Sequence, residues 1–315
     1  MTEASITPDP ATASKSAHVL ACPVCQQPLH QQGKRFACEA NHSFDMARQG
    51  YLNLLLANHK RSRAPGDNAD MIHARQRFLD QGYYQAISEQ LNALVCQWFT
   101  PDAQLADVGC GDGYYTARLI EAINVHTQSG NPDSTGCIYG VDISKEALKV
   151  AARRYKPQTT GIAVHWLVAS GGRLPLLPHA LDGIISLFTP VMPEGWYQAL
   201  KPGGKLILAT TGQAHLLELR QKIYPDVTNR VFDPTEKLLQ QGFRPVQNDP
   251  IKLTTAATIN AQDLPDLLTM TPHGWRSSTA ARESVLALPQ LTLTLDVDFR
   301  VYEAIAAAKP EEPSQ

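Results

Sequence analysis

Two kinds of hydrophobic pattern alternate along the middle of the chain. Short, mainly apolar runs are typical of buried strands, whereas apolar residues at intervals of three and four predict helices. The helical pattern is clear where one face would carry Ala147, Leu148, Ala151 and Ala152. The two patterns predict strands at residues 105–108, 137–141, 164–168, 181–190 and 205–210, and helices at 71–79, 85–99, 116–122 and 145–155. This alternation predicts an α/β fold with a doubly wound sheet.

The pattern weakens beyond residue 220. Residues 251–254 and 291–299 alternate between apolar and polar, which favours antiparallel strands that close the sheet. Between them, residues 264–268 predict a helix, and residues 270–276 predict a rigid loop containing Trp275.

A glycine turn follows the first predicted strand, in the sequence Asp-Val-Gly-Cys-Gly-Asp-Gly at residues 107–113. Glycines at alternate positions, Gly109 and Gly111 among them, let the backbone turn sharply and let a ligand approach main-chain N–H groups. The spacing is not the G-x-G-x-x-G of dinucleotide enzymes. Carboxylates at Asp107 and Asp112 would repel a phosphate and attract a cation. The alternative is a structural turn without a ligand.

A further acid, Asp142, ends the next apolar run. A carboxylate at the tip of the neighbouring strand can accept hydrogen bonds from both hydroxyls of a ribose. Asp107 and Asp142 therefore favour an adenosine ligand that carries an ammonium group. This pattern resembles that of class I, Rossmann-like S-adenosylmethionine methyltransferases.

Cysteine and histidine residues near the amino terminus have the spacing of a metal site. Cys22-x2-Cys25 is followed after twelve residues by Cys38-x3-His42. Two such turns can bring three thiolates and one imidazole to the corners of a tetrahedron, which is the arrangement of structural zinc. A redox pair of Cys22 and Cys25 is the alternative, but it would leave Cys38 and His42 unexplained. A module this small needs the metal because its own apolar core is small.

Composition limits the classes of function. With 315 residues and 43% hydrophobic content, the chain can form one large α/β domain and a small module. A net charge of −2 excludes a strongly basic nucleic-acid coat, so any RNA contact must be local. We find no signal peptide and no run of about 18 apolar residues, and the cysteine usage favours a reducing compartment. We expect a cytoplasmic protein.

The predicted organisation has five parts. A disordered leader covers residues 1–18, the zinc module 19–57, a basic linker with two helices 58–100, the methyltransferase domain 101–308 and a disordered tail 309–315. The linker contains three closely spaced cations, Lys60, Arg61 and Arg63. They are either a solvated connection or, beside a zinc module, candidates for contacts with RNA phosphates.

Several motifs taken in order resemble the RlmA (RrmA) family of 23S rRNA (guanine-N1)-methyltransferases. They are the cysteine and histidine cluster, Phe44-Asp45-Met46-Ala47, Gly50-Tyr51, Asn53-Leu54-Leu55, residues 59–67, Met270-Thr271-Pro272 and Trp275-Arg276. The resemblance covers roughly residues 20–305. It implies a zinc domain that contributes to rRNA recognition and methylation of a guanine in a hairpin of 23S rRNA. It also implies zinc on Cys22, Cys25, Cys38 and His42, and the methyl donor on Tyr84, Gly111, Asp112 and His215. A homodimer rests on the resemblance alone.

The chemistry implied is attack of guanine N1 on the sulfonium methyl group. N1 lies on the pairing edge of the base, so the enzyme must take an unpaired or extruded guanine. Phe188 and Pro190, at the end of the fourth strand, are the candidates for the wall on which the base stacks, although the family's more Tyr-Ala-Pro-like strand end is absent there. Asp112 or His215 could accept a proton, but no general base stands out. The alternatives are a small-molecule methyltransferase and a non-catalytic, zinc-bearing RNA-binding protein.

Overall fold

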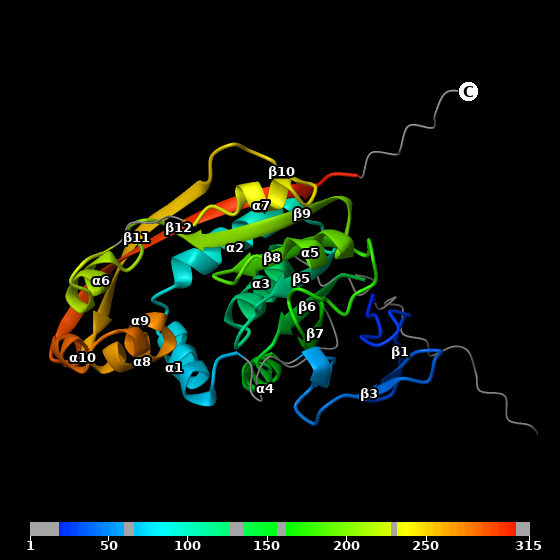
Figure 1. Cartoon of the computed structure of the whole chain (residues 1–315), viewed down its shortest axis with the longest axis horizontal. Coiled ribbons are helices and arrows are strands. Elements are labelled where there is room, and N and C mark those ends of the chain that lie inside the picture. The colour runs from blue at the N-terminus through cyan, green and yellow to red at the C-terminus, as the bar shows by residue number, and fades with distance from the viewer. Residues whose placement is uncertain (1–18, 60–65, 127–134, 156–161, 228–231, 307–315) are drawn as a thin grey trace, which may run out of the picture.

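The computed structural model describes residues 19–59, 66–126, 135–155, 162–227 and 232–306. The predicted leader at 1–18, the tail at 309–315 and the cations Lys60, Arg61 and Arg63 lie outside these ranges. A large sheet with its helices occupies most of the molecule, and a small three-stranded sheet lies at one end of the long axis (Figure 1). None of the helices in the described ranges is long and apolar enough to cross a bilayer.

The large sheet has nine strands and a parallel centre. Its order is β10 (Phe243–Pro245), β12 (Gln290–Ala304), β9 (Leu200–Thr211), β8 (Leu181–Leu187), β5 (Gln104–Val108), β6 (Cys137–Asp142), β7 (Ala163–Val168) and β4 (Tyr51–Asn53). β11 (Ile251–Asn260) pairs with β12, which runs antiparallel to β9. The doubly wound α/β fold predicted from the alternating patterns is thus confirmed.

The strand order reverses at β5. From β5 the chain moves outward through β6 and β7, and it then returns to place β8 on the other side of β5. Connections that leave β5 in opposite directions open a crevice at the carboxyl ends of β5 and β8, which is where open α/β sheets bind ligands. The glycine turn lies at this point.

The fourth strand is shorter than predicted. β8 ends at Leu187, so the prediction that it extends to Pro190 is wrong. Phe188 adopts a left-handed conformation with φ of 54°, and Pro190 has no N–H group for a ladder. The backbone therefore leaves the sheet at Phe188 and turns across the crevice.

The predicted helices are present with small shifts in their ends. They are α1 (Ala69–Asp80), α2 (Gln85–Trp98), α3 (Tyr114–His126) and α4 (Lys145–Arg154). The side chain of Asn68 caps α1 by accepting from the N–H of Met71, and Ser144 caps α4 by accepting from that of Ala147. Further short elements are η2 (Ala57–His59), α5 (Pro193–Ala199), α6 (Leu217–Ile223), α7 (Thr235–Leu239), η3 (Ala261–Asp263) and α10 (Thr279–Leu286).

The segment predicted as a helix and an aromatic loop forms two helices, α8 (Leu264–Met270) and α9 (Pro272–Arg276). The prediction of a loop at 270–276 is therefore wrong. Proline at the first position of α9 needs no hydrogen-bonded N–H there and has the φ of a helix, so it starts a new helix after the break at Thr271.

The amino-terminal module forms β1 (His30–Gln32), β2 (Arg35–Ala37) and β3 (Ser43–Asp45), which pair antiparallel. It shares a hydrophobic core with the large sheet, because Leu20 and Phe36 are buried together with Tyr139 and Leu167. The following strand, β4, extends the large sheet by pairing parallel with β7. The module is therefore packed firmly on the edge of the large sheet.

Candidate functional site

The glycine turn begins where β5 ends, and all three of its alternate glycines have positive φ. The angles are 80° at Gly109, 56° at Gly111 and 77° at Gly113, a region that residues with a Cβ rarely adopt. A Cβ on Gly109 would also collide with the side chain of Thr189, beyond β8. At Gly111 the nearest atom to a Cβ would be a guanidinium nitrogen of Arg75, at 3.9 Å. The turn thus presents bare backbone to the crevice.

Two of the predicted acids lie beneath this turn. Asp107 is 3% exposed and accepts a hydrogen bond from Thr116 Oγ1 at 2.5 Å. Burial raises the pKa of Asp107 to about 6, and the nearby charge of Asp142 adds to the effect. Asp142 accepts from the N–H of Gly111 at 3.0 Å and from that of Ser144 at 2.7 Å. Burial also raises the pKa of Asp142, although these two N–H groups oppose the rise.

The third predicted acid has a different environment. Asp112 is buried and ion-paired with Arg154 at 3.0 Å, and Arg154 also binds Asp80 at 2.8 Å. Burial raises the pKa of Asp112, while the charge of Arg154 opposes the rise. The carboxylate of Asp112 is thus engaged by α4, so it is poorly placed to accept a proton in the reaction.

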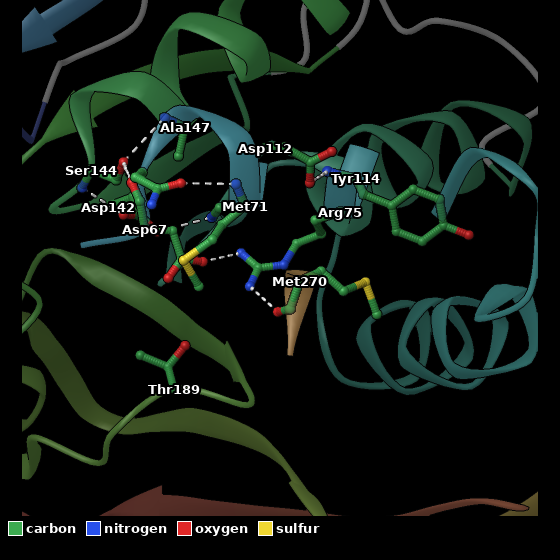
Figure 2. A network of polar contacts seen from close by, with 12 residues as sticks. Asp67, Met71, Arg75, Asp112, Tyr114, Asp142, Ser144, Ala147, Thr189 and Met270 are labelled. Carbon is green, nitrogen blue, oxygen red and sulfur yellow. Dashed lines mark hydrogen bonds and ion pairs between the residues drawn. The ribbon is translucent and has the colours of Figure 1, made fainter. Parts of the chain in front are cut away.

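Arg75 on α1 is a site residue that the sequence analysis missed. Its Nη1 lies 2.6 Å from Asp67 Oδ2, and its Nη2 donates to the carbonyl of Met270 at 3.2 Å. Figure 2 shows the side chain reaching between these partners, with Asp142 and Asp112 close by. A spacing of three residues from Ile72 and Phe78, both buried, places this cation on the packed face of α1. That spacing is the signal that could have revealed it.

Aromatic side chains form another side of the crevice. The ring of His215 lies 6.1 Å from that of Tyr84 and 6.0 Å from that of Phe188, measured between centroids. Burial lowers the pKa of His215 to about 4, so the ring is neutral at pH 7. Its Nδ1 accepts from the N–H of Asp296 at 3.3 Å, which puts the proton on Nε2. The structure therefore brings together three predicted residues from distant parts of the chain.

The site residues fit S-adenosylmethionine. The buried hydroxyl of Tyr115 has no hydrogen-bond partner among the described residues, and burial raises its pKa well above the usual value. A buried polar group without a partner costs about 1–3 kcal/mol, which a polar ligand can recover. Asp107 and Asp112 are buried and Asp142 is half-buried, and the raised pKa values of these three carboxyl groups favour a cationic ligand. The glycine turn supplies the space that such a ligand needs.

The predicted zinc ligands lie together. The ligand atoms of Cys22, Cys25, Cys38 and His42 are all within 4.8 Å of one another. Cys25 Sγ and Cys38 Sγ are 3.5 Å apart, and His42 Nδ1 lies 3.7 Å from Cys22 Sγ and 3.5 Å from Cys38 Sγ. A tetrahedron with Zn–S bonds of about 2.3 Å has edges of about 3.8 Å, so the cluster fits the ion closely.

A cavity of about 410 Å³ separates the turn before β4 from the end of α4. Arg48 and Arg153 are exposed at its walls, beside Tyr155 and Trp166. The benzo edge of Trp166 faces Gly113 and Gly140, and its buried Nε1 has no hydrogen-bond partner among the described residues. Among the described residues, the lining of this cavity holds two arginines and no acid, so it suits an anion.

Comparison with known proteins gives two matches to family models. Residues 20–63 match a model described as RlmA, N-terminal, and residues 105–204 match one described as a methyltransferase domain. The first match contains all four ligands of the metal cluster. The second runs from β5 into β9 and includes the glycine turn.

Two relatives align with nearly the whole chain. A protein of Micromonospora griseorubida, named as a candidate 23S rRNA (guanine-N(1)-)-methyltransferase, is 30% identical in an alignment that covers 91% of this chain and 97% of the relative. The 23S rRNA (guanine(748)-N(1))-methyltransferase of Streptomyces fradiae is 30% identical over 291 residues, 90% of this chain and 95% of the relative. The similarity therefore extends well beyond the common methyltransferase core.

Proposed function

The chain belongs to the RlmA family of 23S rRNA (guanine-N1)-methyltransferases, and we propose that it methylates N1 of a guanine in a hairpin loop of 23S rRNA. The observation that carries this activity is the crevice between β5 and β8. There, buried carboxylates and a bare glycine turn lie opposite an aromatic wall that ends in Phe188. A cationic methyl donor and a flat base can meet in such a crevice.

We assign the donor to three residues. Asp107 attracts the ammonium group of the amino-acid tail, and Asp142 accepts hydrogen bonds from the ribose hydroxyls. Arg75 binds the carboxylate of the tail once it exchanges Asp67 or the Met270 carbonyl for this partner. When bound, S-adenosylmethionine supplies a methyl group on a positively charged sulfur. The residues themselves supply position and charge.

The target base stacks against Phe188 in this proposal. The left-handed backbone at Phe188 lifts its ring out of the sheet, where 40% of the residue is exposed beside the buried His215. As the bond from N1 to the methyl carbon forms, the carbon–sulfur bond breaks and the N1 proton passes to water. We assign no protein base, because His215 Nδ1 already accepts from Asp296 and the carboxylate of Asp112 is paired with Arg154.

The zinc module and the cavity beside it serve RNA recognition in this proposal. Arg48 and Arg153 offer two cations to phosphates. The predicted contacts at Lys60, Arg61 and Arg63 lie outside the described residues, in the segment that joins η2 to α1. Cytoplasmic location and a homodimer are further proposals, the latter tested by light scattering of the purified protein.

The decisive experiment is methyl transfer from labelled S-adenosylmethionine to unmodified 23S rRNA fragments, followed by mass mapping of the product. We expect N1-methylguanosine at one position in a hairpin loop. Donor binding without transfer to any rRNA would overturn the proposal and favour a small-molecule acceptor or a non-catalytic RNA-binding protein.

A pair of variants tests the wall. Phe188→Ala should lower kcat while the donor affinity stays unchanged, because only the base contact is lost. Phe188→Tyr keeps an aromatic face and should retain most of the activity. Equal activity of the wild type and Phe188→Ala would remove Phe188 from the base site.

A further inference from the structure

The short helix α9 is held rigidly although it lies at the surface. A Cβ on Gly274 would collide with the carbonyl of Leu268, so only glycine lets α9 pack this closely on α8. Arg282 Nη1 donates to the carbonyls of Gly274 at 3.0 Å and Ser277 at 2.9 Å. The hydroxyl of Tyr224 and Nδ1 of His273 are 3.1 Å apart. Contacts with α8, with α10 and with Tyr224 thus hold α9 in place.

The largest side chain of this helix is nevertheless left in solvent. Trp275 is 63% exposed, whereas Trp166 and Trp196 are 2% and 0% exposed and Trp98 is partly buried with Lys205 over its ring. The guanidinium of Arg276 lies 4.6 Å from the centroid of the Trp275 ring. Trp275 and the guanidinium of Arg276 together form an exposed aromatic and cationic face on α9.

The charge around Trp275 identifies the kind of partner. The pKa of His273 is lowered to about 4 by burial and by the charges of Arg220 and Arg276, so these two cations lie on the same part of the surface. A neutral imidazole, two cations and a flat aromatic face favour a polyanion with stacking groups. Single-stranded nucleic acid has both features, because every base has a π-face and every nucleotide a phosphate.

The position of α9 relates this surface to the crevice. The carbonyl of Met270, two residues before α9, accepts from Arg75, and Arg75 faces Gly111 of the glycine turn. The metal-binding module lies at the other end of the molecule's long axis (Figure 1). RNA that reaches the crevice from the zinc module would continue toward α9.

We propose that Trp275 and Arg276 form a stacking platform for an unpaired base of the RNA near the target guanine. Trp275 stacks on the base, and Arg276 contacts the adjacent phosphate. The inference rests on the proposed function, since it names a second contact with the same RNA. It adds a place where the unpaired strand is held after the target base has entered the crevice.

The test uses the exposure of Trp275 as an internal probe. Binding of a 23S rRNA hairpin fragment should quench the tryptophan fluorescence and reduce its further quenching by acrylamide. Trp275→Phe should remove most of this response, because the other three tryptophans are buried or partly buried. Trp275→Ala should weaken RNA binding about 5- to 150-fold, the range for loss of one stacked base. Trp275→Phe should keep most of the affinity, and donor affinity should stay unchanged in both variants.

A second pair of variants separates stacking from charge. Arg276→Gln should reduce the slope of log affinity against log salt by about one, whereas Arg244→Gln, an exposed arginine on β10, should leave the slope unchanged. If the wild type methylates the RNA but Trp275→Ala binds it as tightly as the wild type, the platform is refuted and the proposed function stands. If the wild type fails to methylate any rRNA while it binds the donor, the proposed function fails, and the platform with it.

Discussion

The titration of Asp107 gives a quantitative test of how the crevice attracts its donor. Its pKa is raised from an ordinary 3.8 to about 6, because burial disfavours the charged carboxylate and the hydrogen bond from Thr116 offsets only part of this. A cationic donor binds the ionised form better. We therefore predict that donor affinity rises with pH between 5 and 7 and then levels off.

The size of the effect follows from the ionised fraction. At pH 5 roughly one Asp107 side chain in ten is ionised if its pKa is about 6. Because the apparent affinity scales with the fraction of competent protein, binding at pH 5 should be about tenfold weaker than at the plateau. His215 and His273 titrate near pH 4 and so contribute little in this window.

Asp107→Asn should flatten this pH dependence, leaving only the part contributed by Asp142 and Asp112, whose pKa values are also raised, and should weaken donor binding at pH 7. An ammonium 4 Å from a carboxylate gains at most about 4 kcal/mol at an effective dielectric constant of 20, so we expect a loss on the order of a hundredfold. Stability should behave in the opposite way. Because the carboxyl pKa is higher in the folded protein, Asp107 adds to the free energy of unfolding at low pH. This contribution of about 3 kcal/mol is complete below pH 3.8 and is lost as the pH rises through about 6. The neutral variant avoids that loss, and its amide oxygen can still accept from Thr116.

Isothermal titration of S-adenosylmethionine at pH 5, 6 and 7, at constant ionic strength, measures the affinity. Thermal unfolding at the same pH values measures the stability, and zinc content is checked in each sample. An affinity that stays constant from pH 5 to 7 would refute the reasoning. So would an Asp107→Asn variant that keeps the same pH dependence as the wild type.

Three further predictions concern other parts of the chain. Cys38→Ser should release zinc, measured by elemental analysis, and should lower the unfolding temperature of the whole protein, whereas Cys96→Ser, on α2 and outside the cluster, should change neither. Gly109→Ala should abolish detectable donor binding and cost several kcal/mol of stability, because strain of about 1–3 kcal/mol at positive φ adds to the collision with Thr189. The control is Gly33→Ala, which is also at positive φ but in open space. This variant should incur the strain alone and bind the donor normally. Arg75→Gln should weaken donor binding at least tenfold in the same titration, and an unchanged affinity would remove this residue from the site.

The elements that were predictable from the sequence are those set by neighbouring residues. The strand, glycine turn and helix from residue 104 to 126 follow from local hydrophobic pattern and from the φ freedom of glycine. The ligands from Cys22 to His42 are separated by few residues, so their spacing alone limits them to one metal geometry. The closing strands β11 and β12 were recognised by alternation but were longer than predicted, since pairing between them extends beyond the clearest part of each pattern.

Partners that are distant in the sequence were decided by the tertiary structure. Packing of α8 on α1 brings the Met270 carbonyl to Arg75, 195 residues away, and no local pattern encodes that contact. The same is true of the pairing of Asp112 with Arg154, which engages a carboxylate that the sequence alone offered to the donor.

The sequence by itself thus determined the chemistry available in this protein: acids and glycines for a cationic nucleoside, thiolates and an imidazole for zinc. Only the tertiary structure decided which of these groups face the crevice, and which tautomer or protonation state each of them has. The N–H of Asp296 gives His215 its tautomer, and burial gives Asp107 its raised pKa. Both effects arise because folding removes water and fixes distant neighbours, and neither solvent exclusion nor long-range contact is contained in local residue patterns.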